Sequence, residues 1–244
     1  VSDIETIKNV ASISSNNDYE LGSLIAETVE NIGSDGLIYV EDGTGASTSV
    51  EYTDGFQIAR GYTSQGFVNN QERLTVELEN PMILVYDGKI EQTGELVPLL
   101  EEVSESGRPL LIIARSYSDE VVQTLVLNKM RGSLSSCAIK APGFGDIGSE
   151  IMIDIASACN TSVFNSTSRR LSSCNASLLG SSRKVVANHI STSVIDAAGA
   201  SIAMQDRISN LKSQLDEATD HHMIVSLKQR ISSLSGGVAL IKVG

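Results

Sequence analysis

The sequence predicts a mixed α/β fold built on a partly parallel sheet. Two continuous apolar runs, residues 82–86 and 110–114, lack the polar alternation of strands that have one face in water. Segments with helical periodicity, residues 94–106 and 119–131, follow them along the chain. Buried strands that alternate with helices of this length indicate parallel strands with right-handed crossovers, covered on both faces. The chain has 244 residues, enough for one large domain or two small ones.

A smaller α+β segment is predicted before this sheet. Capping residues at positions 14–18 precede a helical pattern that Gly33 ends. The apolar positions of that helix are Leu21, Leu24, Ile25, Val29 and Ile32. Residues 36–40 then predict a strand, residues 41–45 an acidic turn, and residues 49–52 a second extended stretch.

Further elements are predicted after the second helix of the sheet. Residues 134–140 and 162–164 predict strands, and residues 149–159 a helix. The Ser- and Asn-rich stretch at 161–182 predicts a surface loop with one short helix, followed by a hairpin at 184–188 and 193–195. Two amphipathic helices then form a helical hairpin; Asp220 begins the second, and Gly236 and Gly237 end it. A last strand covers residues 238–243.

Composition excludes several classes of function. The chain has 18 Lys and Arg against 30 Asp and Glu, a net charge of −12, which disfavours nucleic-acid binding. Three scattered cysteines predict neither a disulfide framework nor a metal site, and they favour a reducing compartment. No apolar run reaches the roughly 20 residues of a membrane helix. The first residues lack the pattern of a signal peptide, so we expect none.

One glycine-rich motif suggests a dinucleotide site. Residues 143–148 read G-x-G-x-x-G between a predicted strand and a predicted helix. A dinucleotide site also needs an acidic residue about 20 positions later to hold the ribose. After Asp154 the next acidic residue is Asp196, and Pro142 stiffens the turn. A tight structural loop is therefore the favoured interpretation, and a nucleotide-binding α/β enzyme remains the alternative.

Two helices carry more apolar residues than a sheet can cover. In the segment 121–130 the apolar side chains spread over about 240° of arc, and in 96–103 over about 160°. A helix that lies on a sheet needs a stripe just over 100° wide. Part of each helix is therefore predicted to stay exposed and to form an apolar groove, unless a further element covers it. No catalytic constellation accompanies the groove.

Several long motifs resemble the group I chaperonins, the GroEL-type 60 kDa folding machines. They are Tyr-Val-Glu-Asp-Gly-Thr-Gly at 39–45, Arg-Gly-Tyr at 60–62, the segments 109–114 and 124–132, Lys-Ala-Pro-Gly-Phe-Gly-Asp at 140–146, and Ser-Gly-Gly-Val-Ala-Leu-Ile-Lys-Val-Gly at 235–244. The resemblance extends over essentially the whole chain. It implies part of an intermediate domain at 1–53, an apical domain at 54–238, and an intermediate-domain return strand at 239–244.

The resemblance implies a chaperone segment rather than a complete enzyme. The apical domain of this family binds unfolded polypeptides and the 10 kDa lid co-chaperonin, and identical subunits form a ring. ATP and Mg belong to an equatorial domain whose phosphate loop has no counterpart here, so this chain is expected to lack ATPase activity. It is also expected to be a monomer in dilute solution. The implied location is a bacterial or phage-host cytoplasm; the alternatives are the mitochondrial matrix and the plastid.

The family's binding positions transfer residue by residue. The polypeptide- and lid-binding positions fall on Tyr62, Phe67, Val97, Leu100, Val122, Val126 and Leu127. The last five are expected to be partly exposed and to line one channel, whereas Leu125 is expected in the core. The hinge glycines match Gly55, Gly236 and Gly237. Catalytic, cofactor and metal residues are expected to be absent.

Two departures mark a divergent member. Ile147, Gly148 and Ser149 stand where the family usually has a basic run, and the Ser-rich segment 166–182 stands where it usually has a more acidic and ordered one. At a single binding position, Gly66 also stands where the family usually has an aromatic residue. A peptide-recognition domain with defined sequence preference remains a third function to be distinguished.

Overall fold

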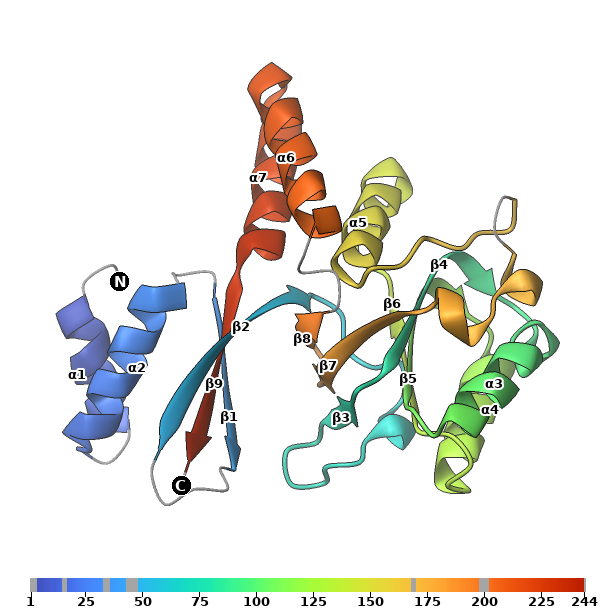
Figure 1. The fold of residues 1–244 in the computed structure, drawn as a ribbon, viewed down its shortest axis with the longest axis horizontal. Coiled ribbons are helices and arrows are strands. Elements are labelled where there is room, and N and C mark those ends of the chain that lie inside the picture. The colour runs from blue at the N-terminus through green and yellow to red at the C-terminus, as the bar shows by residue number, and fades with distance from the viewer. Residues whose placement is uncertain are drawn as a thin grey trace. The chain divides into compact units, whose positions relative to one another are not determined.

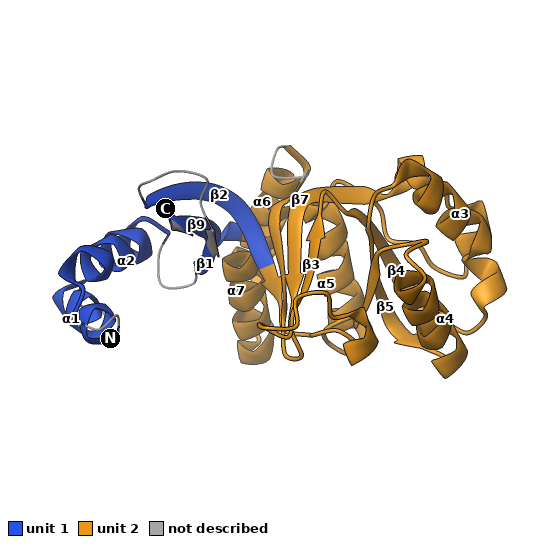
Figure 2. Ribbon diagram, turned by 90° about the horizontal axis from the view of Figure 1, so that it is seen from below, with its two compact units in different colours: residues 1–56, 235–244 blue, residues 57–234 orange. Residues whose placement is uncertain are grey.

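The structure is a computed structural model that describes residues 4–14, 17–32, 36–42, 48–167, 170–197 and 202–243. Its backbone divides into two compact units, residues 1–56 with 235–244 and residues 57–234 (Figure 2). The chain therefore passes from one unit to the other twice. The predicted acidic turn at 41–45 lies mostly outside the described residues.

The first unit is a small α+β arrangement. Helices α1 (Ile4–Ser14) and α2 (Tyr19–Ile32) pack together, and α2 lies beside β9 (Gly237–Val243). Strand β9 pairs in parallel with β1 (Leu37–Asp42) and antiparallel with β2 (Ser49–Ile58). The predicted helix and three strands are confirmed. Helix α1 was not predicted.

The second unit contains the predicted parallel strands. Strand β5 (Leu110–Tyr117) pairs in parallel with both β4 (Met82–Ile90) and β6 (Ser136–Lys140). Helices α3 (Val97–Ser106) and α4 (Asp119–Met130) are the crossovers between them. Helix α5 (Gly145–Ala158) lies on the opposite face of these strands (Figure 2). Both faces are thus covered, which explains why residues 110–114 are wholly buried.

Antiparallel strands extend this sheet. Strand β7 (Gly180–Ala187) pairs antiparallel with β4, with β3 (Val76–Glu79) and with β8 (Thr192–Ala197). The hairpin is confirmed, although β7 begins inside the predicted loop. The strand predicted at 162–164 is reduced to an isolated bridge between Phe164 and Tyr86. Two 3-10 turns, η3 (Leu171–Ser173) and η4 (Ala176–Leu178), occupy the Ser-rich segment.

The helical hairpin completes the second unit. It consists of α6 (Ile202–Glu217) and α7 (His221–Ser235), as predicted (Figure 1). Asp220 caps α7, because its Oδ2 accepts a hydrogen bond of 2.9 Å from the Met223 backbone N–H. Leu211, Leu227 and Leu234 are buried, which confirms the apolar stripe of each helix.

Candidate functional site

Helices α3 and α4 lie side by side on one face of the parallel strands (Figure 1). A proline in the first turn of α3 favours its start, and Gly107 ends it with φ of +69°. Ser118 caps α4 by accepting a hydrogen bond of 3.3 Å from Val121 N–H. Both helices run in the same direction because each links two parallel strands.

A groove of about 450 Å³ separates the two helices. Near their N-terminal ends, Thr93 Oγ1 donates a hydrogen bond of 3.4 Å to Glu120. Near their C-terminal ends, Ser104 Oγ donates one of 2.8 Å to the carbonyl of Ser133. The residues that line the groove are Thr93, Val97, Leu100, Glu101, Ser104, Glu105, Thr124, Asn128, Ser133 and Leu134.

The groove is apolar at its base, and its rim is polar except at Val97. Leu100 and Leu134 are buried, whereas Val97 keeps 40% of its surface exposed. Glu101 and Glu105 are exposed on α3. The described lining contains no Lys or Arg. Such a surface can hold an apolar side chain of a bound chain and leaves carboxylates beside it.

The other flank of α4 is occupied by the segment 62–68. Lys129 donates hydrogen bonds of 3.2 and 2.6 Å to the carbonyls of Gly66 and Val68. A Cβ on Gly66 would lie 2.5 Å from Val126 Cγ1, so the backbone approaches this helix closely. Val126 therefore faces the chain around Gly66 and not α3.

The structure corrects the prediction that five residues would line one channel. Only Val97 and Leu100 are among the residues that line the groove; Val122, Val126 and Leu127 are not. Leu100 is only 8% exposed, so its expected exposure is wrong. The exposure of Leu127 and Met130 confirms that part of the apolar arc on α4 stays uncovered. Periodicity could not reveal that the segment 62–68 covers part of that arc.

Other predicted binding residues occupy different settings. Phe67 is 1% exposed, so it belongs to the core of the second unit and cannot contact a partner in this conformation. Tyr62 is half-buried and forms a bridge with Ile139. Leu127 and Met130 are exposed on the outer face of α4. Leu125 is buried, as expected.

Sequence reasoning missed the polar members of the groove. Val97, Glu101 and Ser104 recur at intervals of four and three residues, and Thr124 and Asn128 at an interval of four. Residues at these intervals share one face of a helix. The pattern is present in the sequence, but the periodicity of apolar residues alone does not single it out.

The glycine motif at 143–148 forms a tight turn at 143–144 that leads directly into the first turn of α5, so the loop interpretation holds only for its first two residues. Gly143 has φ of +76°, and a Cβ on it would lie 2.9 Å from Gly148 Cα. The Arg115 guanidinium covers the loop, donating hydrogen bonds of 3.3 Å to Gly145 O and 2.7 Å to Ser149 Oγ. It also pairs with Asp87 at 2.6 Å.

The charge beside this loop is unfavourable for a phosphate. Partial burial opposes ionisation of Asp87, but hydrogen bonds from Arg115 and Ser149 and the adjacent guanidinium outweigh it. The pKa of Asp87 therefore lies below its ordinary value, and the group stays a carboxylate at neutral pH. Arg115 is thus already matched by an anion of the chain itself.

The predicted hinge glycines lie close to the two crossings between the units. Gly55 precedes the crossing that follows Phe56, and Gly236 and Gly237 follow Ser235, the first residue after the second crossing. Gly237 does not adopt the left-handed conformation, and a Cβ there would be 3.5 Å from Ile32. Glycine is consequently not required at position 237 in this conformation.

The described residues contain no group of three His, Cys, Asp or Glu side chains able to hold a metal ion. Within the same part of the chain, no helix is long and apolar enough to cross a membrane. No protein-family model matches the sequence.

Proposed function

We propose that this chain is a chaperone segment that captures non-native polypeptides and a 10 kDa lid co-chaperonin along α3 and α4. The observation that supports it best is the groove between these helices, with Val97 exposed at its rim. Leu127 and Met130 add apolar surface on the outer face of α4. Exposed apolar side chains bind unfolded chains without reading their sequence. The group I chaperonin motifs in the sequence point to the same function.

The corrected positions narrow the proposed binding surface. Val97, Leu127 and Met130 offer contacts directly, whereas Leu100 supports the groove from below. Burial of one apolar side chain contributes roughly 1.5–3 kcal/mol. The free energy of a few such contacts, after the cost of association is subtracted, is enough for weak binding of unfolded chains without sequence preference.

The wider chaperonin properties belong to the same proposal. Identical subunits would form the ring, and ATP with Mg would act from a part of the protein outside this sequence. The three cysteines are free and buried, in keeping with a reducing compartment such as a bacterial cytoplasm or mitochondrial matrix.

A nucleotide-binding enzyme at the glycine loop has less support. Arg115 and Asp87 already neutralise each other there, and Asp146 lies in the first turn of α5. An added phosphate would meet two carboxylates. A titration with NAD or ATP tests this alternative; saturable binding lost in Arg115→Met would favour it over the chaperone function.

Capture of a urea-unfolded reporter enzyme tests the chaperone proposal. We expect the chain to suppress aggregation of the diluted reporter, and Val97→Asp combined with Leu127→Asp to lose most of that effect. Ile190→Asp is the matched control, because Ile190 is exposed in the turn between β7 and β8, away from the groove. Equal suppression by all three proteins would contradict the proposed surface.

A further inference from the structure

A second cleft lies between the N-terminal parts of α5 and α7. Its volume is about 410 Å³, and it is separate from the groove between α3 and α4. Ile147 of α5 and Met223 of α7 are both 55% exposed, and Leu227 is buried. These three residues give the cleft an apolar interior with open access. Methionine adapts its shape to varied partners and is common on surfaces that bind many of them.

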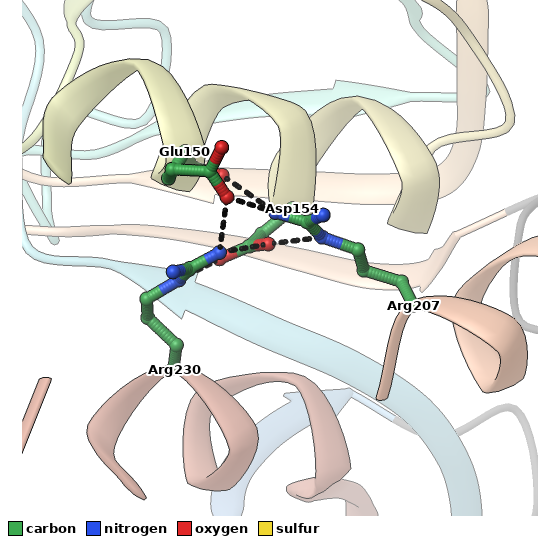
Figure 3. A network of polar contacts seen from close by, with 4 residues as sticks. All are labelled: Glu150, Asp154, Arg207 and Arg230. Atoms are coloured by element: carbon green, nitrogen blue, oxygen red, sulfur yellow. Dashed lines mark hydrogen bonds and ion pairs between the residues drawn. The ribbon is translucent and has the colours of Figure 1, made fainter. Parts of the chain in front are cut away.

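Four of the charged side chains around this cleft balance one another. Arg207 and Arg230 bind Glu150 and Asp154 in a closed network of four ion pairs, with N to O distances of 2.6 to 3.1 Å (Figure 3). That network carries two positive and two negative charges. Its members therefore leave no net charge for a ligand.

Two further carboxylates line the cleft outside this network. They belong to Asp146 in the first turn of α5 and to Asp220 at the start of α7. Neither has an ion-pair partner among the described residues. The cleft thus combines an apolar interior with a local excess of two negative charges, in a chain whose net charge is −12.

We propose that this cleft binds a segment of another protein that carries an aliphatic side chain beside a lysine or arginine. The aliphatic group would contact Ile147, Met223 and Leu227, and the cation would lie between Asp146 and Asp220. Charge complementarity selects a basic segment over an acidic one and accelerates its encounter with the acidic chain. The site does not depend on the chaperone function proposed above, because it shares no residue with that groove.

Fluorescence polarisation with two matched peptides tests this site. Both are amphipathic and carry the same leucines; one has lysine and the other glutamate at every polar position. We expect the lysine peptide to bind the intact chain, to bind less tightly as salt rises from about 50 to about 500 mM, and the glutamate peptide not to bind. Met223→Lys should weaken the lysine peptide roughly tenfold or more, and Asp146→Asn should reduce the salt dependence.

Control variants distinguish binding in the cleft from binding elsewhere on the chain. Ile190→Lys adds the same charge at a distant exposed position and should leave the affinity within about twofold. Circular dichroism and urea unfolding establish that each variant folds. Equal binding of both peptides, or loss of binding in Val97→Asp but not in Met223→Lys, overturns the proposal. So does self-association that Met223→Lys abolishes, because the occupant would then be a second copy. The aggregation assay reports on the groove between α3 and α4 and not on this cleft. Failure of the cleft proposal can therefore be distinguished from failure of the proposed function.

Discussion

Gly66 and Val126 lie so close together that a Cβ on the glycine would stand 2.5 Å from Cγ1 of the valine. The two residues belong to the turn η1 (Gln65–Phe67) and to α4. Where the family resemblance implies an aromatic side chain at position 66, this chain instead brings its backbone against the helix. The absence of a side chain on Gly66 therefore explains why Val126 is half-buried rather than open to a partner.

Gly66→Ala should destabilise the fold by about 1–3 kcal/mol, because the added methyl overpacks the contact with Val126. Valine has one strongly preferred rotamer in a helix, so it cannot turn away easily. Urea unfolding measures the change. In a Val126→Ala background the cost should largely disappear, since the clashing methyl groups are gone.

Gly94→Ala is the matched control for this substitution. No heavy atom lies within 4 Å of a Cβ built on Gly94, so the free energy of unfolding should stay within about 0.5 kcal/mol. An equal effect of Gly66→Ala in both backgrounds would show that the two residues do not constrain each other.

Leu100 and Val97 should respond in opposite ways to substitution. Leu100→Ala removes a buried side chain and should cost about 2–5 kcal/mol of unfolding free energy. Val97→Asp changes an exposed residue at the start of α3, where an acidic group is tolerated, and should cost under about 0.5 kcal/mol. It should nevertheless weaken capture of unfolded protein. Urea unfolding and the aggregation assay are run on the same two variants. A loss of stability identifies Leu100 as a residue that holds the groove together, and a loss of capture without a loss of stability identifies Val97 as a residue that contacts the bound chain.

The sequence predicted the fold best where a strand is buried on both faces, because only apolar residues suit such positions. Apolar runs at 82–86 and 110–114 predicted parallel strands correctly, because strands covered on both faces need no polar residue. Part of the apolar arc of α4 stays exposed at Leu127 and Met130, as predicted, yet periodicity does not show which element covers the rest. Part of that apolar surface meets the turn around Gly66, a contact between residues far apart in the sequence. Likewise, Arg207 and Arg230 give no local sign of their shared partners on α5.

All three cysteine thiols should resist alkylation in the native state. Burial raises the pKa of Cys159 to about 12, and burial followed by the nearby Glu102 charge raises that of Cys174 to about 12. Burial raises the pKa of Cys137 even further. At pH 8 the thiols are therefore protonated and covered, and the thiolate is the reactive form. Iodoacetamide followed by mass spectrometry should add no label to the folded chain and three labels in denaturant. Rapid labelling of the folded chain would show that these sites open readily.

Asp154→Asn should be among the most destabilising polar substitutions in the chain. The Asp154 side chain is only 5% exposed and accepts hydrogen bonds from both Arg207 and Arg230. Its neutralisation leaves two half-buried guanidinium groups with one carboxylate, a loss of up to about 3–5 kcal/mol. Glu91→Gln is the control, because the Lys89–Glu91 pair is exposed on both sides and should contribute under about 1 kcal/mol. Similar costs for the two substitutions would mean that solvent reaches the network.

The same network should make the fold sensitive to acid through Glu150. Partial burial opposes ionisation of this carboxyl, but hydrogen bonds and charges from Arg207 and Arg230 outweigh it and lower its pKa below the ordinary 4.5. A carboxyl with a lowered folded-state pKa stabilises the protein above its unfolded-state pKa. That contribution disappears as the pH falls through the lowered value. We therefore expect the free energy of unfolding to fall more steeply below pH 4.5 in the parent chain than in Glu150→Gln. Urea unfolding at a series of pH values measures both slopes, and Glu91→Gln should keep the parent slope. Identical slopes for Glu150→Gln and the parent would show that protonation of Glu150 does not govern the acid transition.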